Sequence, residues 1–316
     1  CRFGAHLNTR LYHNGREVAA TQHSLPCRIV KDAVKPKVSL TEDERNISAT
    51  GNGFTYTFSK HYGIFTSLLV GGKEQLAGNP VLSACRAPTD NDRNIQYRWL
   101  QLDEWKGENL DKSFVKVYDC KLENDEIIVS GSLSGISRAP LMRYTQRISI
   151  SEDGAIHFTL DGNIREDAIW LPRLGYEWEL PAESNAFTYY GNGPAESYRD
   201  MCHAGHVSVH ESNVDAEYVH YVRPQEHGNH TSVKWLRIGD LEFMADDAME
   251  IQVSKYSTAA LLKAEHTDEL IADGKTHLRI DYKVSGLGSN SCGPDLEKEY
   301  RLSEKKIHFC FTVRPR

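Results

Sequence analysis

Short segments in which large apolar residues alternate with small or polar ones restrict the fold of this chain more than any other feature. Residues 54–58 alternate aromatic side chains with threonine, and residues 174–180 and 307–313 repeat the pattern with other apolar side chains. A period of two places every second side chain on the same face of an extended strand, which is typical of a sheet with one buried face. The pattern therefore predicts β-strands at all three places.

Comparable segments follow one another through most of the sequence, separated by turn sequences such as Glu152-Asp153-Gly154. They lie near residues 64–70, 114–120, 126–133, 143–150, 155–161, 206–210, 232–238, 249–255 and 278–284. Helix is expected only at residues 257–265, where Ser257 is suited to be the N-cap, and in a short stretch around residues 96–105. So many strands with so little helix predict an all-β fold, a large antiparallel sandwich.

The N-terminal part of the chain differs from the rest. Residues 1–30 hold at most two strands, around Leu7–Tyr12 and Glu17–Gln22, with Asn14-Gly15 as the turn between them. Residues 31–37 are charged, contain a proline and lack periodicity, so they are interpreted as a linker to a main domain over residues 38–316. Because the sequence opens on a cysteine instead of methionine, we expect it to be a piece of a longer chain.

Composition limits the class of protein. A hydrophobic content of 40% and a charged content of 26% are ordinary for a soluble globular protein. The net charge of -7 argues against nucleic acid or an anionic membrane as a partner. No apolar run is long enough to span a membrane, and no signal-peptide pattern opens the sequence. Seven irregularly spaced cysteines predict reduced thiols in a cytoplasmic protein, without a disulfide framework or a zinc site.

The stretch from Tyr189 to Asp200 is predicted to be a strand that ends in a glycine-proline turn. Glycine permits backbone angles closed to other residues, and proline restricts the exit from the turn. An acid, an aromatic residue and a second acid then follow at a spacing of two. The residues of this motif are Gly191, Gly193, Pro194, Glu196, Tyr198 and Asp200. Taken alone, the stretch fits either a rigid structural corner or part of a site.

Residues 85–92 form a second polar stretch, which leaves a strand and ends in Asp90-Asn91-Asp92. This ending could begin a calcium loop, although the glycine and the distal glutamate of an EF-hand are missing. It could also bind sugar hydroxyl groups, or cap its own backbone in an Asx-type turn.

Two further stretches combine turn residues with polar side chains. Residues 218–230 contain three histidines, which could bind a metal, but their spacing matches no helical or two-strand ligand pattern. A polar rim for a sugar or a satisfied hydrogen-bond network is the preferred interpretation there. Residues 286–294 form a loop of small residues. No nucleophile elbow, phosphate-binding loop or recognisable Ser-His-Asp set occurs.

Four spaced motifs resemble, in the same order, the C-terminal domain of the large β-galactosidases of glycoside hydrolase family 2. They are Arg86-Ala87-Pro88 with Asp90-Asn91-Asp92; Gly191-x-Gly193-Pro194-x-Glu196-x-Tyr198-x-Asp200; Tyr221-x-x-Pro224-x-Glu226-x-Gly228; and Gly286-x-Gly288 followed by Ser291-x-x-Pro294. The resemblance covers residues 38–316. Residues 15–19 resemble the last strand of the immunoglobulin-like domain that precedes this domain in the family, and residues 1–14 have no place in it.

The resemblance implies a galactose-mutarotase-like β-supersandwich that belongs to a retaining β-galactosidase, an enzyme that hydrolyses terminal β-D-galactosides such as lactose. In that family the catalytic glutamates and the magnesium ligands belong to a central TIM barrel, which this sequence lacks. Glu196 and Glu226 have no family counterpart in a catalytic role. We therefore expect no catalytic residue, cofactor or metal site in this chain, and no hydrolysis by it alone. Its expected partners are the remainder of the enzyme chain, the galactoside and further copies in a homo-oligomer.

The resemblance also implies that this domain closes one wall of the active-site mouth. Asn91 and Asp92 correspond to the start of a flexible loop near the mouth, and Ser291 and Cys292 to a loop that carries a sugar-stacking aromatic in some members. Cys292 stands in place of that aromatic, in a loop one residue shorter, which predicts a smaller and less aromatic aglycone site. Residues assigned to structural support are Gly191, Gly193, Pro194, Glu196, Tyr198, Asp200 and Glu226.

Two other functions share this fold class. An aldose 1-epimerase would need a histidine acid and a glutamate base near one sugar oxygen, for which His227 or His206 with Glu226 are candidates. A stand-alone carbohydrate-binding module would need no such pair. Tight binding of galactose by the chain alone would favour the module.

Overall fold

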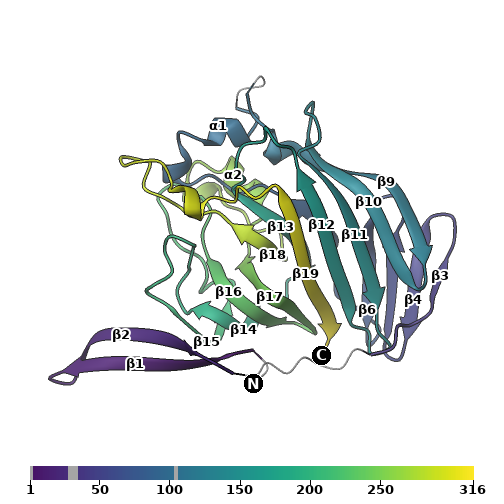
Figure 1. Cartoon of the computed structure of the whole chain (residues 1–316), viewed down its shortest axis with the longest axis horizontal. Helices are drawn as coiled ribbons and strands as arrows, with labels where there is room; N and C mark the ends of the chain where they lie inside the picture. The colour runs from purple at the N-terminus through teal and green to yellow at the C-terminus, as the bar shows by residue number, and fades with distance from the viewer. Residues whose placement is uncertain (1–2, 28–34, 103–105) are drawn as a thin grey trace.

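The computed structural model describes residues 3–27, 35–102 and 106–316 (Figure 1). Strands dominate these residues. The first group is β1 (Ala5–His13), β2 (Arg16–Leu25), β3 (Leu40–Glu42), β4 (Asn46–Gly51), β5 (Phe54–Ser59), β6 (Ile64–Val70), β7 (Lys73–Glu74), β8 (Gly78–Ser83), β9 (Ser113–Glu123) and β10 (Glu126–Gly135). The second is β11 (Met142–Ile150), β12 (Ile156–Ile164), β13 (Arg173–Pro181), β14 (Ala186–Gly193), β15 (His206–Asn213), β16 (Asn229–Ile238), β17 (Leu241–Ser254), β18 (Lys275–Val284) and β19 (Lys306–Pro315).

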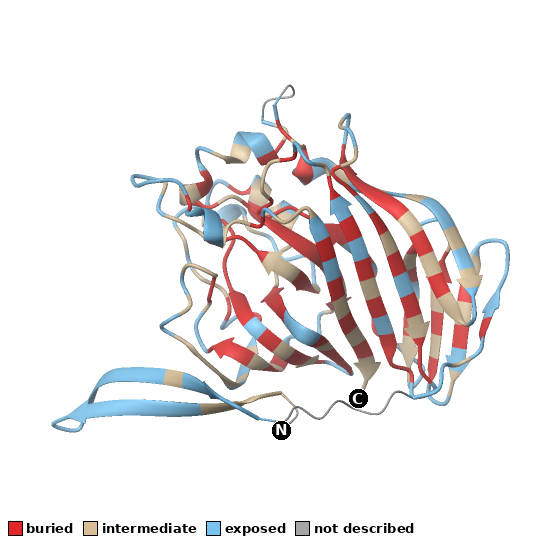
Figure 2. Cartoon of the chain, in the orientation of Figure 1, coloured by how far each residue is buried: buried red, intermediate tan, exposed pale blue. Residues whose placement is uncertain are grey.

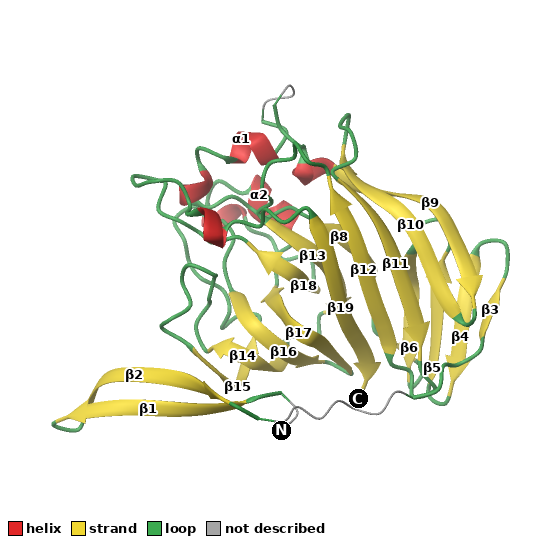
Figure 3. Ribbon diagram, in the orientation of Figure 1, coloured by secondary structure: helices red, strands yellow, loops and turns green. Residues whose placement is uncertain are grey.

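Helices are short and gather at one end of the molecule (Figure 3). The α-helices are α1 (Gln96–Trp99) and α2 (Thr258–Lys263). The 3-10 helices are η1 (Asp90–Asp92), η2 (Leu110–Lys112), η3 (Thr267–Glu269) and η4 (Lys298–Tyr300). The predicted N-cap is confirmed, because the Ser257 hydroxyl accepts a hydrogen bond from the backbone nitrogen of Ala260 at 3.1 Å. No helix in the part of the chain that the structure describes is long and apolar enough to cross a membrane.

Three antiparallel sheets organise the described strands. A twelve-stranded sheet follows the order β15-β14-β16-β17-β19-β12-β11-β10-β9, with β18, β13 and β8 attached beside it, and β3 to β7 form a five-stranded sheet. The long strand β17 belongs to two layers: Leu241–Ala245 pair with β19, whereas Glu250–Ser254 pair with β18. This shared strand lets one sheet fold over on itself, and the predicted all-β antiparallel sandwich is confirmed.

Aromatic side chains from both layers fill the space between them. Phe158 of β12 and Phe311 of β19 stack with ring centroids 4.6 Å apart, and Trp178 of β13 meets Phe158 edge-on from the opposite layer. Phe65 of the five-stranded sheet packs against the same ring at 5.9 Å. Each buried aromatic ring removes a large apolar area from water, so this cluster stabilises the contact between the two layers and the five-stranded sheet. Figure 2 shows the resulting alternation of buried and exposed positions along β12 and β19.

The two N-terminal strands form a hairpin that projects from the body of the molecule (Figure 1). Both predicted strands are present, and Asn14 and Gly15 form the turn between them with φ angles of 50° and 76°. The hairpin contacts the body through Gln22, which exchanges two hydrogen bonds of 2.9 Å with the backbone of Val207. Of the predicted linker at residues 31–37, residues 31–34 lie outside the described residues.

The cysteines depart from the prediction at one position. Cys27 is disulfide-bonded, so the expectation of seven reduced thiols is wrong there. Among the residues that the structure describes, the free cysteines are Cys85, Cys120, Cys202, Cys292 and Cys310.

Candidate functional site

The four sequence motifs meet at the end of the molecule where the helices gather. Arg86 donates hydrogen bonds to the carbonyl oxygens of Ser285 at 2.8 Å and Gly286 at 3.2 Å. The backbone nitrogen of Glu226 donates a hydrogen bond to the carbonyl oxygen of Ala87, and the backbone nitrogen of Ser197 donates one to the carbonyl oxygen of Asn229. Segments separated by up to 200 residues are therefore joined directly, by backbone groups and by one guanidinium.

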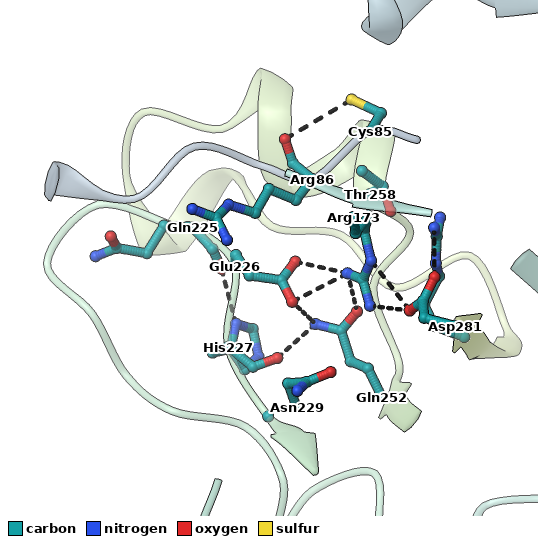
Figure 4. A network of polar contacts seen from close by, with 12 residues as sticks. Cys85, Arg86, Arg173, Gln225, Glu226, His227, Asn229, Gln252, Thr258 and Asp281 are labelled. Carbon is teal, nitrogen blue, oxygen red and sulfur yellow. Dashed lines mark hydrogen bonds and ion pairs between the residues drawn. The ribbon is translucent and has the colours of Figure 1, made fainter. Parts of the chain in front are cut away.

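A buried polar cluster lies at the centre of this meeting point, formed by Arg86, Arg173, Glu226, Gln252 and Asp281 (Figure 4). The Arg173 Nη1 lies 3.0 and 2.9 Å from the two carboxylate oxygens of Glu226, and its Nε lies 3.1 Å from Asp281 Oδ2. Gln252 donates to Glu226 Oε1 at 3.1 Å. Burial alone would lower the pKa of Arg173, but the carboxylates of Asp281 and Glu226 raise it above its usual value. Paired in this way, the charges can remain ionised without water.

Arg86 holds Asp92 in a second buried ion pair. Its Nε and Nη2 donate to the two oxygens of Asp92 at 3.1 and 2.7 Å, and the backbone nitrogen of Thr89 donates to Asp92 Oδ2 at 2.9 Å. Residues 90–92 could begin a calcium loop, bind a sugar or cap their own backbone. The structure shows the third arrangement, in which Asp92 accepts a hydrogen bond from the backbone of Thr89. Asp92 is 2% exposed and therefore lies beneath the surface, whereas Asn91 is only partly buried.

The loop that follows β18 is anchored at its base and exposed at its tip. Asp200 accepts hydrogen bonds from the backbone nitrogens of Leu287 at 2.9 Å and Gly288 at 2.6 Å. Asn91 donates to the Gly288 carbonyl at 2.7 Å and accepts from the Ser291 nitrogen at 3.2 Å. Ser291 and Cys292 are both exposed. Two side chains from distant motifs thus fix the loop that presents the predicted pocket-wall residues.

Glycine is required where this loop begins. A Cβ atom at Gly286 would lie 2.6 Å from the carboxyl carbon of Asp200, closer than real Cβ contacts come. The acid could then not reach the two amides. The absence of a side chain at this position is what allows the backbone and the carboxylate to approach each other.

In the glycine-proline motif, Glu196 is held by neutral hydrogen-bond donors. Tyr221 Oη donates to Oε1 at 2.9 Å, and the Gly228 nitrogen donates to Oε2 at 2.7 Å. Backbone amides or arginines were expected as donors to Glu196 and Asp200, and backbone amides are present. Arg173 pairs with Glu226 instead, and Arg199 lies 3.7 Å from Glu250. The expected close packing of the two glycines is present, because a Cβ at Gly191 would lie 2.6 Å from Val233 Cγ2 and one at Gly193 2.1 Å from Tyr189 Oη. The Gly193-Pro194 peptide bond is cis.

The aromatic residue of that motif reaches the buried polar cluster. Tyr198 is fully buried, and its hydroxyl lies 3.5 Å from Glu226 Oε1. The turn is therefore in contact with the ion pairs that organise this end of the molecule.

Sequence reasoning missed Glu250, a buried acid on β17. The backbone nitrogen of Val284 donates to its Oε1 at 3.1 Å, and Asn229 Nδ2 donates to its Oε2 at 2.8 Å. Burial raises the pKa of Glu250 to about 7, although both hydrogen bonds and Arg199 oppose the shift. Glu250 fixes the last residue of β18, from which the exposed loop departs.

Two of the three histidines of residues 218–230, His227 and His230, take part in a hydrogen-bond network. His230 is fully buried, with Nε2 2.8 Å from Glu217 Oε2 and Nδ1 3.0 Å from Tyr189 Oη. His227 is also buried and contacts the Gln225 carbonyl at 2.8 Å. Within the described residues, no group of three His, Cys, Asp or Glu side chains could hold a metal ion. Because Arg173 and Gln252 occupy its oxygens, Glu226 is not available as the base that an epimerase would need.

Comparison with known proteins gives a consistent family. A family model described as "Beta galactosidase small chain" matches residues 50–313. A β-galactosidase of Actinobacillus pleuropneumoniae is 31% identical over 88% of this chain and 28% of its own length. Those of Staphylococcus xylosus and Kluyveromyces lactis are 29% and 27% identical over 88% and 95% of this chain. This chain spans only 28% and 30% of those two relatives.

Similarity to solved structures is weaker. A putative aldose 1-epimerase of Escherichia coli K12 aligns with 88% of this chain and 99% of its own, at a TM-score of 0.45 and 11% identity. A galactose 1-epimerase of Lactobacillus acidophilus NCFM aligns with 98% of both chains, at a TM-score of 0.43 and 10% identity. A likeness of this size says nothing about activity.

Proposed function

Because this chain belongs to the beta galactosidase small chain family, we propose that it is the C-terminal β-sandwich domain of a retaining β-galactosidase. The whole enzyme hydrolyses terminal β-D-galactosides such as lactose, and forms a homo-oligomer. The catalytic carboxylates lie in the remainder of the enzyme, and this domain walls the mouth of the active site. This chain covers only 28% of the length of two of its relatives, which supports catalysis by the much larger remaining part.

The anchored loop after β18 is the observation that carries this proposal. Asp200 and Asn91 hold its base, while Ser291 and Cys292 are exposed at its tip. A rigid base with exposed polar residues suits a wall that orients a sugar without reacting with it. The Cys292 thiol lacks the π face on which the C–H groups of a sugar stack, so the aglycone would be held by smaller contacts.

The contacts of the two motif acids, Glu226 and Glu196, support catalysis by another part of the enzyme. Retaining hydrolysis needs two carboxyl groups about 5–5.5 Å apart beside the glycosidic bond, one of them free to act as nucleophile. Glu226 is 2% exposed and bound to Arg173, and Glu196 is bound to Tyr221 and Gly228. Neither acid can approach a substrate without breaking the contacts that hold this end of the molecule.

Magnesium, which the whole enzyme is expected to use, is proposed to bind in the barrel that this sequence lacks. Among the described residues, no group of three His, Cys, Asp or Glu side chains could bind the metal. This domain would then contribute to the active site through shape and polar contacts alone.

Hydrolysis of a chromogenic galactoside tests the proposal. This chain should show no turnover alone, and turnover when it is joined to or mixed with the remainder of the enzyme. Turnover by the chain alone that disappears in Glu226→Gln would overturn the proposal. Equilibrium binding of galactose to the chain separates the remaining alternative, since tight binding without the larger part would indicate a stand-alone carbohydrate-binding module.

A further inference from the structure

A cysteine, a histidine and an aspartate lie in contact on the outer face of β12 and β19, away from the buried polar cluster. The two strands are antiparallel neighbours in which Asp161 lies opposite His308 and Thr159 opposite Cys310. Since side chains alternate along a strand, His308 and Cys310 point to the same face. Figure 2 shows this face as the exposed and half-buried bands of both strands.

The geometry of the three side chains is that of a nucleophile, a base and an orienting acid. His308 Nδ1 lies 2.7 Å from Asp161 Oδ1, and His308 Nε2 lies 3.3 Å from Cys310 Sγ. A carboxylate can only accept a hydrogen bond from Nδ1, which leaves the Nε2 lone pair directed at the thiol. This is the arrangement that activates nucleophilic cysteines and serines on unrelated folds.

The site is open to small molecules. The His308 and Asp161 side chains are 69% and 51% exposed, and Cys310 is half-buried with Sγ 3.6 Å from Thr159 Oγ1. The pairing of β17 with β19 ends at Ala245, beside this site. The next two residues of β17, Asp246 and Asp247, are exposed.

We propose that Cys310 is a covalent modification site, a thiol that His308 activates toward small cationic disulfides. His308 Nε2 takes the proton from Cys310 Sγ while the sulfur attacks one sulfur of the disulfide. The disulfide bond of the reagent breaks, and the leaving thiolate takes the proton back from the imidazolium. The products are a mixed disulfide on Cys310 and one free thiol, so protons and electrons balance without another reactant.

The surrounding charges determine which reagents react. Burial raises the pKa of the Cys310 thiol, the Thr159 hydroxyl lowers it, and the acids Asp246, Asp161 and Asp247 raise it further. The spontaneous thiolate is therefore scarce at neutral pH, and reaction depends on the proton transfer to His308. The same acids attract cationic reagents and repel anionic ones.

The test follows mixed-disulfide formation at each cysteine by peptide mass spectrometry, with cystamine as the cationic probe and glutathione disulfide as the anionic one. The exposed Cys292 is the internal control, since its thiol contacts the Ser291 hydroxyl, which is too weakly basic to take its proton. Cystamine should react at Cys310 faster than glutathione disulfide does. The variant His308→Gln should slow the cystamine reaction at Cys310 at least about tenfold, Asp161→Asn should slow it less, and neither should change Cys292.

The pH dependence of the wild-type rate keeps the test independent of the variants. Without a base, the rate at Cys310 should rise about tenfold per pH unit up to the pKa of the thiol. With His308 as the base, the rate should level off while most of the Cys310 thiol is still protonated. A rate that rises without a plateau, or one that His308→Gln leaves unchanged, would overturn the proposal.

Discussion

The Asp200 carboxylate lies 2.6 Å from the backbone nitrogen of Gly288, so the turn after β14 holds the loop that departs from β18. The two residues are 88 positions apart in the sequence. A second bond from Leu287 makes the contact bidentate, and charge-assisted bonds of this kind are stronger than neutral ones.

Asp200→Ala should release this loop without unfolding the sandwich. Two backbone donors lose their acceptor, which costs about 1–3 kcal/mol if they stay dry, and less if water replaces the carboxylate. Limited proteolysis should cut residues 289–294 faster than in the parent chain. Asp268→Ala, at an exposed position on η3, is the matched control and should leave the cleavage rate unchanged. Equal cleavage in both variants would show that Asp200 does not fix the loop.

Glu196→Ala should lower the melting temperature of the chain by several degrees. Tyr221 Oη and the Gly228 nitrogen both donate to Glu196, and truncation leaves them unmatched at a cost of about 1–3 kcal/mol. Glu196→Gln keeps one acceptor oxygen and should lose less. Thermal unfolding followed by circular dichroism checks the order. Unchanged stability together with lost sugar affinity would instead place the turn in a binding site.

Arg173→Met should destabilise the chain more than Glu196→Ala does. Methionine fills much of the volume of arginine but leaves Glu226 buried without its cation and Asp281 with Arg279 alone, and breaking a buried pair costs about 3–5 kcal/mol. Arg237→Met removes an arginine whose side chain is 43% exposed and should cost much less. Urea unfolding of the two arginine variants measures the difference, and equal losses would show that the buried ion pairs contribute no more than a pair whose arginine is half-exposed.

Glu250 should make the chain less stable as the pH rises toward neutrality. Its pKa in the folded chain is about 7, above the usual 4.5, so the folded state binds its proton more tightly than the unfolded state does. The contribution of this group to stability is therefore highest below pH 4.5, falls between pH 4.5 and pH 7, and is constant above that range. Urea unfolding of the parent chain and Glu250→Gln across this range should show that the variant lacks this component of the slope. Parallel curves would mean that Glu250 titrates normally.

Cys292→Trp in the whole enzyme should change KM for aryl galactosides more than kcat. A tryptophan at the tip of the anchored loop would stack on the aglycone equally in the ground and transition states, which alters uniform binding only. Steady-state kinetics with several aglycones measure the effect, and a galactoside with a small alkyl aglycone is the control. Identical kinetics for all of them would remove the loop from the site.

The strength of the alternation decided which strands could be predicted. Residues 54–58, 174–180 and 307–313 lie in β5, β13 and β19, as predicted. Strand β4 was not predicted, and β8 was expected only as the strand that residues 85–92 leave, without bounds. The apolar positions of β4 include a small alanine, and β8 contains Pro80, a residue that disfavours interior strands but is tolerated where a strand pairs on one side.

The sequence motifs located the site, but they did not identify all of the buried polar residues that form it. Glu250, Gln252 and Asp281 alternate with apolar residues on β17 and β18, and the period-two rule places such side chains in solvent. Here that face is turned inward, because β17 is shared by two layers. Only the packing of the layers shows that these polar groups are buried and paired.

The position of β19 has a consequence for how the chain acquires its structure. This strand lies between β17 and β12, in the interior of the twelve-stranded sheet within the described residues. Residues 156–163 therefore have no partner on that side until residues 306–313 have been synthesised. During translation β12 presents an open edge to other chains for as long as the intervening residues take to emerge. Chaperones that cover strand edges would act mainly in that interval, and the sandwich should complete its folding only after residues 306–313 have been synthesised.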